Sequence, residues 1–127
     1  MTAVVLDTSA LLAGLHDEPG ADAVLPLLTT AVMSAANWSE TWQKLDQHGV
    51  DADKTGNRLR ALGLRVEPVT EADAVHAARL WTRTRAAGLS LGDRCCLALG
   101  ARLGLTAVTA DTAWDDLNVD VDIRLIR

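Results

Sequence analysis

Short apolar runs alternate with longer segments of helical period along the whole chain. The apolar runs predict strands at residues 4–6, 31–33, 64–67, 106–109 and 121–126, because runs of this length bounded by turn-forming residues are typical of buried strands. The segments between them, beginning with residues 8–15, repeat their apolar positions at helical spacing. This alternation predicts an α/β fold, a three-layer α/β/α domain around a central, mostly parallel sheet of about five strands.

Length and composition fit one compact domain covering residues 1–127. The sequence is 49% hydrophobic, which is enough to build a core. It has neither a signal-peptide pattern nor an apolar run approaching the roughly 18 residues of a membrane span, so we expect a cytoplasmic protein with no membrane partner. Cys95 and Cys96 are adjacent on a predicted buried helix, which favours core packing over a disulfide or a thiolate metal site.

Four acidic residues occupy positions that a parallel sheet brings together. Asp7 ends the first strand and Asp111 follows the fourth, while Glu40 and Asp93 lie on helices with strongly apolar neighbours. Ligands of open parallel sheets bind outside the carboxyl ends of the strands, where the strand order reverses. Crowded carboxylates require a compensating cation, and oxygen ligands select Mg²⁺ or Mn²⁺ rather than zinc. We predict that Asp7, Asp93 and Asp111 bind the metal and that Glu40 holds a water molecule or a second ion.

Each acid also has a structural interpretation that the sequence leaves open. Asp7 and Asp111 suit helix N-caps, and Asp93 lies three residues after Ser90, the spacing of a capping box. Glu40 precedes Lys44 by one helical turn and can pair with it.

The motifs around these acids resemble those of PIN-domain ribonucleases, in particular VapC-type toxins. They are VVLDTSALLAGLHDEPGA, SAANWSET, LSLGDRCCLALGARLG and TAVTADTAW, in this order over essentially the whole chain. The resemblance implies an acidic quartet at Asp7, Glu40, Asp93 and Asp111, a further acid at Asp115, and hydroxyls beside the site at Thr8 and Thr109. Thr112 stands where many relatives have Arg, which puts one basic RNA contact in doubt.

The same resemblance implies a Mg²⁺- or Mn²⁺-dependent endoribonuclease, the toxin of a toxin-antitoxin pair, that cuts tRNA, rRNA or mRNA. Single-stranded loops are the expected targets, because their splayed nucleotides can enter a cleft. The implied partners are a VapB-type antitoxin and a second copy in a homodimer. We expect the antitoxin tail to lie along the helices near Trp38 and Trp42 and to bring a basic side chain to the acids.

The net charge of -5 is unusual for a protein that binds phosphate backbones. Arg94, next to Asp93, is the favoured RNA contact. The three histidines have no metal-ligand spacing and suit surface or capping roles. The tryptophans favour core or dimer-interface packing over base stacking. Five arginines in the second half of the chain could form a basic rim around the site, or they could lie on solvated helix faces. They are Arg79, Arg83, Arg85, Arg94 and Arg102.

Two other functions are consistent with an acid after the first strand. A phosphatase of the haloacid-dehalogenase type needs a second acid two residues later, where this chain has Ser9, and a late lysine, whereas the only lysines are Lys44 and Lys54. A non-catalytic module would use the acidic pocket to receive a partner's basic segment. Metal-dependent RNA cleavage distinguishes the three hypotheses.

Overall fold

A computed structural model describes residues 3–127, in which five strands form one sheet. All four pairings are parallel, and the order is β3-β2-β1-β4-β5. The five predicted strands are confirmed, with ends shifted by one or two residues, and the sheet is parallel throughout. The strands are β1 (Val5–Leu6), β2 (Val32–Ser34), β3 (Arg65–Glu67), β4 (Ala107–Thr109) and β5 (Ile123–Leu125).

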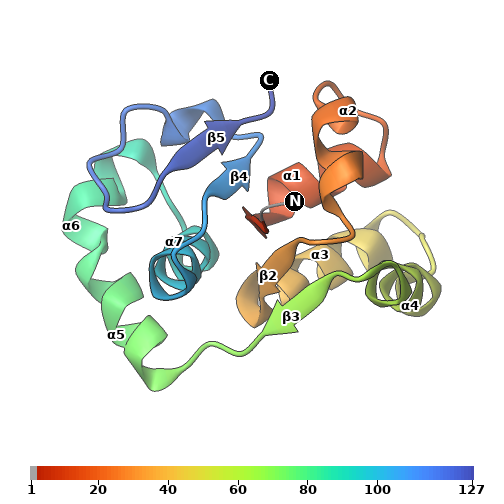
Figure 1. Cartoon of the computed structure of the whole chain (residues 1–127), viewed down its shortest axis with the longest axis horizontal. Coiled ribbons are helices and arrows are strands. Elements are labelled where there is room, and N and C mark those ends of the chain that lie inside the picture. The colour runs from red at the N-terminus through yellow and green to blue at the C-terminus, as the bar shows by residue number, and fades with distance from the viewer. Residues whose placement is uncertain (1–2) are drawn as a thin grey trace.

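Helices cover both faces of the sheet, as predicted. Figure 1 shows α5, α6 and α7 on one side of the strands and α1, α2 and α4 on the other, while α3 contacts both α1 and α7. None of the helices in residues 3–127 is long and apolar enough to cross a membrane. The helices are α1 (Thr8–Leu15), α2 (Ala21–Val24), α3 (Ala35–Gln47), α4 (Ala52–Leu62), α5 (Glu71–Arg79), α6 (Trp81–Thr84) and α7 (Leu91–Leu103), with 3-10 turns η1 (Leu25–Leu27), η2 (Arg85–Ala87) and η3 (Thr112–Trp114).

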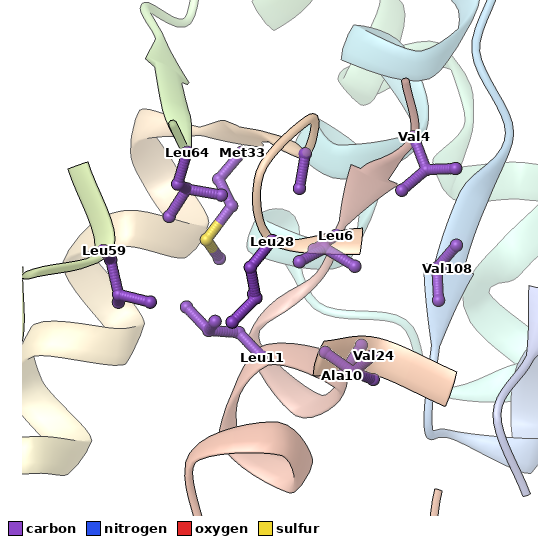
Figure 2. Packing of buried hydrophobic residues seen from close by; sticks show 11 residues of the cluster. Val4, Leu6, Ala10, Leu11, Val24, Leu28, Met33, Leu59, Leu64 and Val108 are labelled. Atoms are coloured by element: carbon purple, nitrogen blue, oxygen red, sulfur yellow. The ribbon is translucent and has the colours of Figure 1, made fainter. Parts of the chain in front are cut away.

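The two larger hydrophobic clusters form because successive strand residues point to opposite faces. Leu6 packs with Leu11 and other residues of α1, α2 and α4 (Figure 2). Its neighbour Val5 packs with Cys96 and other residues of α7. Cys95 and Cys96 are buried and free, so their predicted core role is confirmed.

The predicted core packing of the tryptophans holds only in part. Trp114 is fully buried, but Trp81 is 47% exposed, so packing in the core of this chain is wrong for Trp81. On α3 the buried face consists of Asn37, Thr41 and Leu45. Trp38 and Trp42 lie beside that face, half-buried, and pack edge to face with ring centroids 5.5 Å apart.

Candidate active site

The four predicted acids line one cleft at the carboxyl ends of the central strands. The chain proceeds from β1 to β2 on one side and returns to β4 on the other, so the strand order reverses between β1 and β4, and a crevice forms at such a point. Asp7 follows β1 and Asp111 follows β4. The cleft has a volume of about 390 Å³ and is lined by Asp7, Thr8, Ser9, Leu12, His16, Glu18, Glu40, Lys44, His48, Asp93, Asp111 and Arg127.

Asp7 is the buried centre of the site, with 2% of its surface exposed. It caps α1 by accepting a hydrogen bond from Ala10 N at 2.8 Å. The Ser9 hydroxyl donates to both carboxylate oxygens at 2.8 and 2.9 Å, and the Thr109 hydroxyl donates to Oδ2. Burial raises the pKa of Asp7 to about 6; these hydrogen bonds oppose the rise, and the charge of Asp93 adds to it. Its carboxylate is therefore held in place, and within residues 3–127 no cationic side chain forms a hydrogen bond or ion pair with it.

Asp93 and Asp111 each cap a helix with one oxygen. Asp93 Oδ2 accepts from Ser90 N at 2.9 Å in a capping box, and Asp111 Oδ1 accepts from Ala113 N at 2.9 Å. Within residues 3–127 the other oxygen of each carboxylate accepts no hydrogen bond. Burial raises the pKa of Asp93, and the charges of Glu40 and Asp111 raise it further. Each acid can therefore cap its helix with one oxygen and keep the other oxygen free for the site, so the two interpretations are compatible.

Glu40 is held in the same way, through Oε1. This atom accepts from Thr8 Oγ1 at 3.1 Å and from Asn37 Nδ2 at 2.9 Å, and Oε2 accepts no hydrogen bond within the described residues. Gly92 leaves room for the carboxylate, because a Cβ there would lie 2.8 Å from Glu40 Cδ. The alternative pairing with Lys44 is not formed in the part of the chain that the structure describes.

The chemistry of these donors suits a hard divalent cation. Carboxylate oxygens are preferred ligands of Mg²⁺ and Mn²⁺, and free oxygens of three acids, together with the buried Asp7, surround one cleft. As the side chains stand in residues 3–127, no group of three or more His, Cys, Asp or Glu is arranged to hold a metal ion. The residues fit the ion by type and location.

Three predicted site residues, Asp115, Arg94 and Thr109, do not line the cleft, although the Thr109 hydroxyl donates to Asp7. Asp115 is exposed and does not line it. Arg94 Nη1 donates to the carbonyl of Ala77 on α5 at 2.8 Å, so it is not placed for the predicted RNA contact. Arg102 forms an ion pair with Asp73 at 3.0 Å, which also removes it from a basic rim.

Other residues around the cleft were not predicted to belong to it. Lys44 and Arg127 supply its basic groups, and Ser9 joins Asp7 to the loop after β4. His16 and His48 cap the C-terminal ends of α1 and α3, which confirms the capping role, but both also line the cleft. Only Ser9 carried a sequence signal, because it stands two residues after Asp7 in the first motif. Lys44 and the two histidines lie near the C-terminal ends of helices and Arg127 follows β5, and no motif marks these positions.

Comparisons with known proteins bear on the family and the fold. The sequence model of the PIN domain matches residues 4–119, whereas no curated protein matches significantly. The fold is similar to that of a chain in a toxin-antitoxin complex from Klebsiella pneumoniae, with a TM-score of 0.78, 17% identity and coverage of 98% of both chains.

Two further structures share the fold at similarly low identity. FitAcB from Neisseria gonorrhoeae matches with a TM-score of 0.70 and 21% identity over 97% of both chains. VapC20 from Mycobacterium tuberculosis, a Sarcin-Ricin loop cleaving toxin, matches with a TM-score of 0.63 and 19% identity over 82% of this chain and 86% of the other. At these identities the likeness establishes the fold alone.

Proposed function

The chain belongs to the PIN-domain family, and from that premise we propose that it is a Mg²⁺- or Mn²⁺-dependent endoribonuclease acting as a VapC-type toxin. The observation that carries the proposal is the convergence of Asp7, Glu40, Asp93 and Asp111 on one cleft. Three of these acids keep one oxygen free, so the fold positions them without using up their capacity to bind a cation. The phosphatase alternative lacks support, because its second acid and its late lysine are absent from the sequence.

The acids of the cleft would bind the cation, and neighbouring hydroxyl groups hold one of them in position. Asp7, Asp93 and Asp111 would hold the ion and Glu40 a water molecule or a second ion. When bound, the ion would activate the attacking water and neutralise charge on the scissile phosphate. Thr109 and Ser9 fix the Asp7 carboxylate, which keeps its orientation constant during the reaction.

We propose a single-stranded loop of tRNA, rRNA or mRNA as the substrate. Lys44 lines the cleft and offers a cationic group to the phosphates, which matters in a chain of net charge -5. Arg127 also lines it, but its Nη1 donates to the Pro19 carbonyl at 3.1 Å and pairs with Glu18 at 3.9 Å. An unpaired nucleotide can be splayed into a cleft, whereas the bases of a duplex stay stacked and paired.

The test compares RNA cleavage by two variants with matched local structure. Asp111 and Asp51 are both exposed helix N-caps; Asp51 accepts from Lys54 N at 3.0 Å and does not line the cleft. Because Asn caps a helix as well as Asp does, Asp111→Asn should abolish Mn²⁺-dependent cleavage and Asp51→Asn should retain it. Cleavage of phosphate monoesters instead of RNA would favour the phosphatase, and no turnover of either substrate would favour the interaction module.

An inhibitory antitoxin is part of the proposal, because solved structures of the same fold include complexes named VapBC. An acidic cleft is blocked by a basic segment. A groove of about 390 Å³ shares His16 with the cleft and is more apolar than the hollow beside Trp38 and Trp42, so we place the tail in this groove. Its other lining residues are Leu15, Leu25, Leu28, Leu45, Val50, Thr55, Arg58, Leu59 and Leu62.

Competition tests this placement. A tail peptide with a basic residue should bind more weakly at high Mn²⁺, and Leu62→Lys, which changes a 53% exposed groove residue, should also weaken it. A peptide affinity that neither change alters would place the antitoxin elsewhere.

The homodimer expected from the resemblance is tested separately by light scattering of the purified protein.

A further inference from the structure

Asn37 lies where three acid-bearing elements of the site meet. It is on α3, three residues before Glu40, and it is fully buried, with 0% of its surface exposed. Residues three apart on a helix share a face, so the Asn37 side chain points along α3 towards the Glu40 carboxylate. An amide in this position is unusual for a core helix face, because buried polar groups are unfavourable unless they are hydrogen-bonded.

The Asn37 amide nitrogen connects the three elements. Its Nδ2 donates to Glu40 Oε1 at 2.9 Å, to the carbonyl oxygen of Gly92 at 3.2 Å, and to Thr8 Oγ1 at 3.4 Å. Gly92 directly precedes Asp93 in the first turn of α7, and Thr8 directly follows Asp7 at the start of α1.

The acceptors around Nδ2 fix the orientation of the amide. Rotating it by 180° would place Oδ1 against the Glu40 carboxylate and the Gly92 carbonyl, two acceptors that cannot donate to it. In the observed orientation Oδ1 is buried and has no partner among the described residues. A side chain chosen for stability alone would not leave an acceptor unsatisfied, so the donors of Asn37 are the part that matters.

Gly92 completes the arrangement by the space that it leaves. It is in a helix, and its φ lies outside the left-handed region, so no backbone conformation requires glycine there. An added Cβ would meet the Glu40 carboxylate, with Oε2 at 3.0 Å. The Glu40 carboxylate can therefore lie beside the first turn of α7 only because residue 92 has no side chain.

We infer that Asn37 is the positioning residue of the site: its amide holds Oε1 of Glu40 against α1 and α7 and so presents Oε2 to the cation and water in the cleft. This inference rests on the proposed function, because it assigns Asn37 a role in that same cleft. Asn37 acts through Glu40 and touches neither substrate nor metal.

The test is a double-mutant cycle between Asn37→Leu and Glu40→Gln, read by Mn²⁺ affinity in electron paramagnetic resonance and by kcat and KM for RNA cleavage. In the wild-type background Asn37→Leu should weaken Mn²⁺ binding or lower kcat by about 10- to 100-fold, as loss of a partner that orients a ligand does. In the Glu40→Gln background it should change either quantity by less than about 2-fold, because the group it orients is already altered.

Thr41→Val is the matched control. Thr41 lies one turn further along the same buried face, and its hydroxyl donates to the Asn37 backbone carbonyl at 2.9 Å without touching Glu40. It should leave Mn²⁺ affinity within about 2-fold of the wild type. If Asn37→Leu does not fold, Asn37→Ala replaces it, with melting curves recorded for every variant.

Equal losses in both backgrounds, or an equal loss in Thr41→Val, would overturn the inference and make Asn37 a general structural residue. An Mn²⁺ affinity and a kcat that both ignore Asn37→Leu would overturn it too, while RNA cleavage by the wild type would still support the proposed function. Absence of RNA cleavage together with Asn37-dependent Mn²⁺ binding would reject the proposed function and leave the positioning role intact.

Discussion

Two capping-box aspartates with opposite electrostatics provide a sharp test of the cleft. Asp73 on α5 and Asp93 on α7 occupy the same helix position, each bonded to the residue three before it. Arg102 contacts both oxygens of Asp73 at 3.0 to 3.2 Å; burial alone would raise the pKa of Asp73, but the Arg102 contact and the cap lower it. Burial and neighbouring acids raise the pKa of Asp93.

The two Asn variants should therefore shift stability in different directions. Asp73→Asn weakens a charge-assisted pair with Arg102, whose side chain is 33% exposed, so it should lower the free energy of unfolding. Asn at position 93 can still accept from Ser90 N, and it removes one charge from a repelling group. Asp93→Asn should thus be at least as stable as the wild type. Any decrease in its free energy of unfolding should stay below about 0.5 kcal/mol.

The pH sets where this contrast is largest. Stability from Asp73, whose pKa is lowered in the folded state, is present above its unfolded pKa and is lost as the pH falls through the folded pKa. The unfavourable charge of Asp93, whose pKa is raised, develops as the pH rises through its folded pKa. Urea unfolding of the EDTA-treated protein at pH 8 is the assay. A loss for Asp93→Asn as large as that for Asp73→Asn would refute the charge-repulsion argument and make Asp93 only a cap.

Three further changes test the same site. Between pH 4 and 6 the metal-free wild type should lose up to about 3 kcal/mol of stability, because Asp7 is ionised in the unfolded chain but stays protonated in the folded chain up to its pKa of about 6; a melting profile of Asp7→Asn as steep as the wild type's would contradict this. Millimolar Mn²⁺ should raise the wild-type Tm, because an ion at 100 times its Kd adds about 2.7 kcal/mol to the free energy of unfolding; an unchanged melting curve would argue against a metal site. Gly92→Ala should keep or slightly raise the Tm, since Ala favours a helix by about 0.5–1 kcal/mol, yet lower cleavage at least about 10-fold by displacing Glu40; full activity would mean that the Glu40 position is unimportant.

Strand positions and the acids next to them could be read from the sequence because both depend on local patterns. The apolar runs before Asp7 and Asp111 mark buried strands, and parallel pairing then places both acids at one edge. Glu40 and Asp93 could be placed only on helices, and their approach to the cleft required the resemblance to a known family.

Contacts between helices could not be read in the same way. Helical periodicity gives spacing but not which face is buried, so Asn37 and Thr41 were overlooked in favour of the larger Trp38 and Trp42. Arg94 was expected at the cleft from its place in sequence, but a rotation of 100° per residue separates it from Asp93 and directs it to α5. Sequence proximity on a helix therefore misleads, whereas proximity at a strand end does not.

The most direct test of hydrolysis by the acidic cleft is the chemistry of the RNA ends. A structured RNA, cut by the wild type with Mn²⁺, is analysed by mass spectrometry beside the same RNA carrying a single 2′-deoxy residue at the cleaved position. Because water and not the neighbouring 2′-hydroxyl is the proposed nucleophile, the products should lack 2′,3′-cyclic phosphate, the deoxy substrate should be cut, and EDTA or Asp111→Asn should stop the reaction. Cyclic phosphate ends, or cleavage that survives EDTA and Asp111→Asn, would contradict a metal-dependent nuclease in this cleft.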